Sequence, residues 1–170
     1  MDDRRTIYDW FANSDLTSSM AGEPLFPESP LMTWDEFCED HTPHFFEGEI
    51  TEQGRCFIMQ VDGEDVGQIY FNDIEVHDEV QRVELDMWMP AEKYCGKGYG
   101  TDALETLCAF LAKRFGVEQI MVQPSGRNPR AMRAYEKVGF VRLDVPQEES
   151  VKEWGANDYY DSVYMVKRIK

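Results

Sequence analysis

The sequence lacks paired cysteines. Its four cysteines stand at positions 38, 56, 95 and 108, no two of them form a C-x-x-C pair, and the chain has only three histidines. Zinc sites and disulfide frameworks require thiols at short or regular spacings. We therefore expect neither a metal site nor a disulfide framework, and the isolated thiols favour a reducing compartment.

Positive charge is also scarce. Lysine and arginine together number 17 against 33 aspartates and glutamates, which gives a net charge of −16. Nucleic acids and anionic membranes bind positively charged surfaces, so the charge argues against both as main partners. It favours a cationic partner. Most of the carboxylates are expected to form a solubilising surface, and some to line a binding cleft.

Long apolar runs and flexible linkers are missing as well. The charged start, Met1-Asp2-Asp3-Arg4-Arg5, is followed by no apolar run of the length of a signal peptide or a membrane span. This favours the cytoplasm. No segment rich in Pro, Gly and Ser divides the 170 residues, so we expect a single domain over residues 1–170.

Three glycines alternate in one short segment, Tyr94-Cys95-Gly96-Lys97-Gly98-Tyr99-Gly100-Thr101. Glycine lets the backbone adopt positive φ and lets a ligand approach the main chain. An apolar strand-like run precedes the segment and a helical pattern follows it, so its N–H groups would face a phosphate at the start of a helix. The spacing matches neither a P-loop nor the dinucleotide-binding fingerprint.

A second motif lies downstream, Asn128-Pro129-Arg130-Ala131-Met132-Arg133-Ala134-Tyr135-Glu136-Lys137-Val138-Gly139-Phe140. In order and separation the two motifs resemble the GCN5-related N-acetyltransferase superfamily. That family pairs an (Arg/Gln)-x-x-Gly-x-(Gly/Ala) turn with an Asn-x-x-Ala-x-x-x-Tyr-x-x-x-Gly-Phe segment. The resemblance is strong from Val83 to Phe140 and weak outside. Because Cys95 replaces the family's Arg or Gln, we expect weakened but not abolished cofactor binding.

The resemblance implies both a fold and a cofactor. The fold is α/β (α+β), with a mixed, mostly antiparallel central sheet of about six to seven strands flanked by about four helices. The cofactor is acetyl-CoA, whose nucleotide end is expected to meet one of the arginines near the second motif. The candidate cofactor-binding residues are Met87, Trp88, Met89, Cys95, Gly96, Lys97, Gly98, Tyr99, Gly100, Thr101, Asn128 and Arg133.

Hydrophobic periodicity and turn residues predict the elements that hold these motifs. Two short helices are expected before residue 47, one around Ile7 to Phe11 and one capped by Thr33 and Glu36. The other predicted elements are a hairpin of strands 56–61 and 65–72, a polar loop at 75–79, a strand at 83–89, a helix at 101–115, a strand at 118–123, a helix between Asn128 and Gly139, and strands at 140–144 and 159–166 separated by an acidic loop containing Trp154.

Transfer of an acetyl group from a thioester to an amine needs an unprotonated amine, a stabilised oxyanion and a proton for the thiolate. Alternation in the strand at 83–89 places Asp86 and Glu84 opposite its apolar face. Asp86 is our candidate base, and Glu84 is a candidate for holding the charge of the acceptor. The resemblance implies oxyanion donors in the backbone near Met87 to Met89, and Tyr135 as the acid. Purely structural roles remain the alternative for each side chain.

The nature of the acceptor rests on the downstream segments. Pro124-Ser125 followed by Asn128, together with the ending Asp161-Ser162-Val163-Tyr164-Met165-Val166, looks most like aminoglycoside 6′-N-acetyltransferases. Those enzymes commonly have Asp where this chain has Gln123, so one expected carboxylate is missing. We expect a cationic small-molecule amine, either an aminosugar or a polyamine, with Trp34, Glu84, Asp158 and Asp161 as candidate contacts.

Other functions stay open on the sequence alone. They are acetylation of a protein N-terminus or a lysine, acetylation of a small metabolite amine, and a non-catalytic acyl-CoA-binding sensor. The oligomeric state is open too, a homodimer included.

Overall fold

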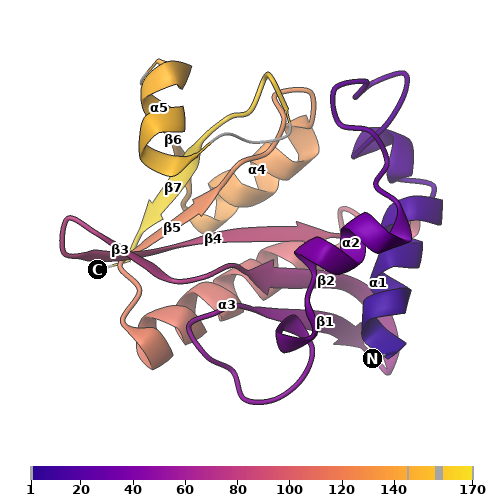
Figure 1. Ribbon diagram of the computed structural model, residues 1–170, viewed down its shortest axis with the longest axis horizontal. Coiled ribbons are helices and arrows are strands. Elements are labelled where there is room, and N and C mark those ends of the chain that lie inside the picture. The colour runs from indigo at the N-terminus through magenta and orange to yellow at the C-terminus, as the bar shows by residue number, and fades with distance from the viewer. Residues whose placement is uncertain (1, 145, 156–158, 170) are drawn as a thin grey trace.

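The computed structural model describes residues 2–144, 146–155 and 159–169. Its seven strands form one sheet in the order β1-β2-β4-β5-β7-β6, with β3 paired to β4 outside this path (Figure 1). Every neighbouring pair is antiparallel except β4 and β5. The prediction of a mixed, mostly antiparallel sheet is confirmed.

The N-terminal part is helical, as its pattern predicts. It contains α1 (Asp2–Asn13), η1 (Thr17–Ser19), α2 (Trp34–Asp40) and η2 (Pro43–Phe45). The capping box of α2 is complete, since Glu36 N–H donates to the Thr33 hydroxyl at 3.3 Å and Thr33 N–H donates to the Glu36 carboxylate at 2.7 Å.

The predicted hairpin consists of β1 (Arg55–Val61) and β2 (Glu64–Phe71). The two turn residues, Asp62 at φ 52° and Gly63 at φ 81°, both lie in the left-handed region that a tight hairpin turn requires.

The strand β4 (Val80–Trp88) is central to the sheet. Val83 and Leu85 are buried and Asp86 is exposed, so the predicted alternation is confirmed. The predicted polar loop at 75–79 is wrong, because Glu75–His77 forms the strand β3 against the start of β4. All three residues of β3 are exposed, and an edge strand without a buried face has no alternation by which the sequence could reveal it.

The parallel neighbour of β4, the strand β5 (Gln119–Val122), pairs only with residues 82–84 of β4. Beyond Glu84, β4 continues to Trp88 with no β5 partner in the described register. A gap therefore separates the two strands at the carboxyl end of β4.

Two helices cover one face of the sheet. η3 (Glu92–Tyr94) leads into α3 (Tyr99–Phe115), which starts two residues before the predicted helix, and α4 (Pro129–Val138) follows β5. Leu104, Leu107 and Leu111 of α3 share a hydrophobic core with Met132 and Tyr135 of α4 and with the sheet. Asn128 caps α4 by accepting a hydrogen bond from Ala131 N–H at 3.1 Å, as predicted.

The C-terminal part differs most from the predictions. The strand predicted at 140–144 is reduced to β6 (Val141–Arg142), and the predicted acidic loop contains α5 (Gln147–Trp154). Acidic residues in the first turn of α5 favour a helix, which explains why a charge run is a poor loop signal here. The strand predicted at 159–166 is wrong for most of its length, because β7 (Met165–Arg168) begins only at Met165 and lies between β5 and β6.

Within the described residues, we find no helix that is both long and apolar enough to cross a bilayer.

Candidate active site

A cavity of about 580 Å³ lies where β4 and β5 part. Aromatic contacts of Phe11 and His41 with Trp88 bring α1 and the end of α2 against the end of β4. The walls include the end of β4, the end of β2, the segment after β5, α4, residues 19–32 and α2. The cavity thus joins N-terminal and C-terminal parts of the chain at the gap in the sheet.

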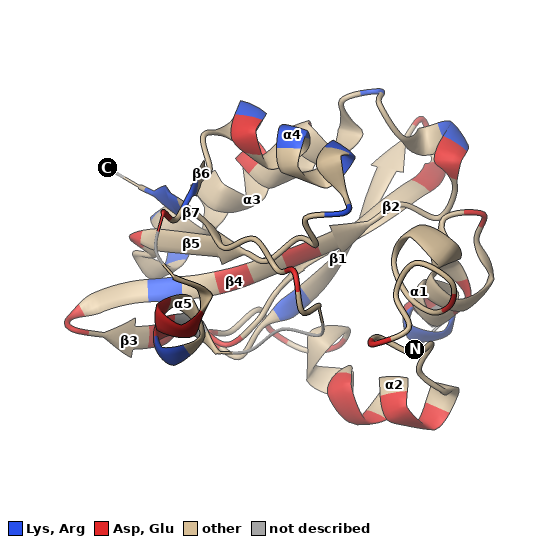
Figure 2. Cartoon of the chain, turned by 90° about the horizontal axis from the view of Figure 1, so that it is seen from above, with Lys and Arg blue, Asp and Glu red and all other residues tan. Residues whose placement is uncertain are grey.

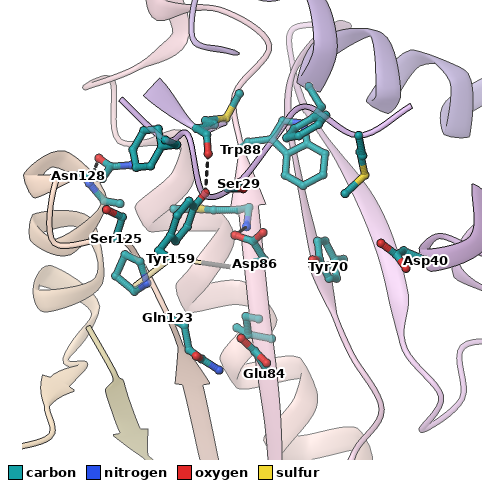
Figure 3. Close-up of a pocket in the computed structure, with 18 of the residues that line it drawn as sticks. Ser29, Asp40, Tyr70, Glu84, Asp86, Trp88, Gln123, Ser125, Asn128 and Tyr159 are labelled. Carbon is teal, nitrogen blue, oxygen red and sulfur yellow. Dashed lines mark hydrogen bonds between the residues drawn. The ribbon is translucent and has the colours of Figure 1, made fainter. Parts of the chain in front are cut away.

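Two carboxylates of β4 face this cavity. Figure 3 shows Asp86 and Glu84 pointing into the same space, with Tyr159 and Gln123 on one side and Tyr70 on the other. The Oδ1 atom of Asp86 accepts a hydrogen bond from the Met87 N–H at 2.7 Å. The carboxylate proposed as a base therefore lies beside a backbone amide that the resemblance assigns to the oxyanion.

Tyr135 reaches the cavity from α4. The residue is 4% exposed, and burial, followed by the negative charge of Asp86, raises the pKa of Tyr135 well above its usual range. The phenol therefore stays protonated at neutral pH. This is the protonation state that the expected acid requires.

The glycine turn lies next to the end of β4. A Cβ on Gly100 would stand 3.1 Å from the Cε atoms of both Met87 and Met89, so this glycine lets α3 approach the strand closely. Gly96 and Gly98 have φ of 70° and 92°, and a Cβ on either would meet nothing within 4 Å. Among the described residues, no side chain accepts a hydrogen bond from the N–H groups of the first turn of α3. The turn thus offers open N–H groups at the positive end of a helix, which suits a phosphate.

The other residues predicted around this turn lie close by in the chain but not in the cavity. Lys97 is exposed, Tyr99 and Thr101 are half-buried, and Cys95 is half-buried just before the turn. Asn128, by contrast, lines the cavity while it caps α4.

The three arginines near the second motif differ in their surroundings. Arg127 binds Glu28 and Asp161, and Arg130 donates to Glu92 at 2.7 Å. Arg133 is exposed on α4, where Figure 2 shows basic segments gathering, in contrast to the acidic segments of α2. Of the three, Arg133 keeps its place as the candidate for a phosphate.

The predicted acceptor contacts are only partly brought together. Glu84 lines the cavity. Trp34 does not: it precedes the cavity residue Phe37 by one turn of α2 and packs on Tyr8 at a centroid distance of 5.3 Å. Asp161 is held by Arg127 and Ser125 outside the cavity wall. Asp158 lies outside the described residues.

Sequence reasoning missed several cavity residues, among them His41. Its ring stacks on Phe37 at a centroid distance of 4.1 Å, and burial lowers the pKa of His41 from 6.5 to about 4. The imidazole is therefore neutral near pH 7. Tyr70 was missed as well, because only the strand register, which pairs it with Asp86, places it there.

Carboxylates dominate the charged lining of the cavity. Glu28, Asp40, Glu84 and Asp86 line it, and no lysine or arginine does so among the described residues. In the same part of the chain, no group of three or more His, Cys, Asp or Glu side chains is arranged to hold a metal ion. Such a lining attracts a cation to the side chains that face Tyr135.

An open glycine turn at the start of a helix, a gap between parallel strands and a carboxylate beside a backbone amide are the features expected of an acyl-group transferase. The chain belongs to the acetyltransferase (GNAT) domain family, whose model matches residues 1–141.

Solved structures agree on the fold. Aminoglycoside acetyltransferase AAC(6′)-Ib in complex with coenzyme A is 22% identical, with a TM-score of 0.71 over 98% of this chain and 90% of that chain. AAC(6′)-Ib with ribostamycin and coenzyme A is 24% identical, with a TM-score of 0.71 over 98% and 88%. Spermidine N-acetyltransferase from Vibrio cholerae, in complex with CoA and spermine, is 20% identical, with a TM-score of 0.67 over 98% and 90%.

Proposed function

We propose that this acetyltransferase transfers an acetyl group from acetyl-CoA to a primary amine of a cationic small molecule, an aminosugar or a polyamine. The observation that carries the proposal is the cavity at the gap between β4 and β5, where Asp86 and Glu84 face Tyr135 and no basic side chain of the described lining opposes a cation. The ligands named for the similar structures, an aminoglycoside and spermine, are of the same chemical kind.

The residues around the glycine turn fit coenzyme A. The open N–H groups between Gly96 and Thr101 would hold the pyrophosphate, and Lys97 and Arg133 would add positive charge. The bound group supplies an acetyl thioester. Its arm would follow the free side of β4 from Met89 to Met87, because Gly100 places the turn against these two side chains.

Within the cavity, the side chains divide the proton transfers between them. Asp86 accepts a proton from the reacting ammonium group of the acceptor, directly or through water. Glu84 binds the positive charge that remains on the acceptor. The N–H groups near Met87 to Met89 stabilise the developing oxyanion. Tyr135, which is protonated at neutral pH, gives its proton to the departing thiolate, and the second proton that the amine loses as the amide forms restores the phenol.

We also propose that the protein is cytoplasmic and forms a homodimer. Sedimentation of the purified chain at several concentrations reports the oligomeric state.

The test is thiol release from acetyl-CoA with a panel of amines: kanamycin, glucosamine, spermidine, spermine, a lysine peptide and a peptide with a free N-terminus. We expect turnover of the multiply charged small amines and not of the peptides. If coenzyme A raises the melting temperature while no amine is acetylated, the chain is an acyl-CoA sensor. Turnover of peptides alone would move the acceptor to proteins.

A further inference from the structure

Residues 19–32 form one wall of the cavity. Ser19, Met20, Phe26, Glu28 and Ser29 of this segment line it. The segment is tied to the C-terminal part of the chain, because the Tyr159 hydroxyl donates to Met20 C=O at 2.6 Å (Figure 3) and the Tyr159 ring packs on Phe26 at a centroid distance of 5.1 Å.

Arg127 also connects this segment to the C-terminal part of the chain. Its guanidinium donates to both carboxylate oxygens of Asp161, at 2.9 and 3.0 Å, and also to Glu28 and to the Leu25 C=O. The cation lies 4.4 Å from the ring centroid of Phe26. A planar guanidinium with fixed donors holds two carboxylates in a defined geometry, which a flexible ammonium group does not.

This arrangement leaves Glu28 half satisfied. Its Oε1 atom accepts from Arg127, whereas its Oε2 atom is buried and has no hydrogen-bond partner among the described residues. The group of one guanidinium and two carboxylates carries a net negative charge. Neither Arg127 nor Asp161 lines the cavity but Glu28 does, so the member of this group that borders the cavity is an acidic residue.

We propose that Glu28 is an acceptor-binding residue whose carboxylate binds an ammonium group of the acceptor, and that Arg127 is the positioning residue that holds this carboxylate in place. The inference rests on the proposed function and adds to it a second cation-binding point, on a different wall from Asp86. It implies an acceptor with at least two amino groups, one that reacts near Asp86 and one that binds Glu28.

The experiment measures acetyl transfer to spermidine and to kanamycin by the wild type and by Glu28→Gln. We expect the KM for the better of the two acceptors to rise about tenfold, as for the loss of one charge-assisted hydrogen bond, with the KM for acetyl-CoA unchanged. Glu23→Gln is the matched control, since Glu23 is an exposed carboxylate of the same segment and does not line the cavity. A monoamine such as 2-phenylethylamine should respond less than the polyamines to Glu28→Gln.

A double-mutant comparison tests whether Arg127 acts through Glu28. Arg127→Ala should raise the KM for the acceptor as Glu28→Gln does, Arg127→Lys should lie between Arg127→Ala and the wild type, and the double variant should be no worse than Arg127→Ala alone. Calorimetric titration with spermidine in the absence of acetyl-CoA gives the same comparison without turnover.

The outcomes distinguish the two proposals. If amines are acetylated but Glu28→Gln binds them as tightly as the wild type, Glu28 has no such role and the proposed function stands. If the wild type neither binds nor acetylates any amine, both fail.

Discussion

The hydrogen bond between Asp86 and its neighbour Met87 is informative about catalysis. The Met87 N–H donates to the carboxylate at 2.7 Å, and the same amide is a proposed oxyanion donor. One N–H group does not serve a carboxylate and an oxyanion fully at the same time. On the proposed mechanism, the arriving acetyl oxygen therefore displaces the carboxylate from this amide and leaves it for the amine.

Replacement of Asp86 by asparagine tests the base. Asp86→Asn keeps the shape and removes the proton acceptor, so we expect kcat/KM for the amine to fall about 100-fold. Steady-state kinetics at several pH values measures this change and should show that the loss is smallest at high pH, where free amine is abundant. Asp65→Asn, at an exposed position of β2, is the control. A variant with the rate and pH profile of the wild type would remove Asp86 from the mechanism.

His41 should make the protein sensitive to acid. Its pKa is about 4 in the folded chain and near 6.5 when exposed, so the unfolded chain binds the proton first as the pH falls. The stabilisation that neutral His41 allows is complete above pH 6.5 and is lost between pH 6.5 and about 4.

The variant His41→Phe keeps the stacking on Phe37 and removes the titration. Urea unfolding between pH 7 and 4 should show a slope smaller than that of the wild type by up to about 1.4 kcal/mol per pH unit. Equal slopes in both proteins would show that His41 is accessible to protons in the folded state.

Among the elements, the glycine turn before α3 carries the clearest prediction. Gly98 has φ of 92°, which an L-residue adopts at a cost of about 1 to 2 kcal/mol. Gly98→Ala should raise the KM for acetyl-CoA because the turn relaxes and its N–H groups rotate away. Gly63→Ala is a matched control, since Gly63 has φ of 81° with open space around it and lies in a hairpin turn that does not line the cavity.

Both glycine variants should lose similar amounts of stability in thermal unfolding. Only Gly98→Ala should bind coenzyme A more weakly in a calorimetric titration. Equal coenzyme A affinity in the two variants would contradict a phosphate site at this turn.

The sequence reveals those elements that combine periodicity with a cap or turn residue. The helix α2 has its capping box, α4 has Asn128 and Gly139, and the hairpin has Asp62-Gly63, so all three were predicted. The elements that it hides lack such a signal. All three residues of β3 are exposed, so the strand shows no alternation, and α5 lies in an acidic segment that is read as a loop.

The same reasoning applies to the candidate site. Asp86, Glu84 and Tyr135 were predictable because strand alternation and the second motif mark them. Glu28 and Asp40 were not predictable, because they reach the cavity from segments distant in the chain and no residue spacing indicates this. From the sequence, Arg127 is one of three arginines that could meet a phosphate. Only its contacts with Glu28 and Asp161 show that it pairs with carboxylates of the protein instead.

For the whole molecule, the net charge of −16 should speed the capture of cations. We expect kcat/KM for spermidine to fall severalfold when the ionic strength rises from about 0.01 to 0.3 M, because salt screens the field of the carboxylates. An uncharged aromatic amine such as aniline serves as the control and should respond little. Equal salt dependence for both acceptors would show that the charge only solubilises the protein.

The place of β7 between β5 and β6 has a consequence for how the molecule acquires its shape. β6 pairs in the described sheet with β7, a strand that follows it in the chain, so its docking must wait until the later strand has arrived. Just before β7, Val163 N–H donates to Pro124 C=O at 2.8 Å, and Tyr159 holds Met20. Contacts of such long sequence range close late and open early. In hydrogen exchange, the amides around Phe26 should therefore lose protection together with those of Val163, well before the amides of α3.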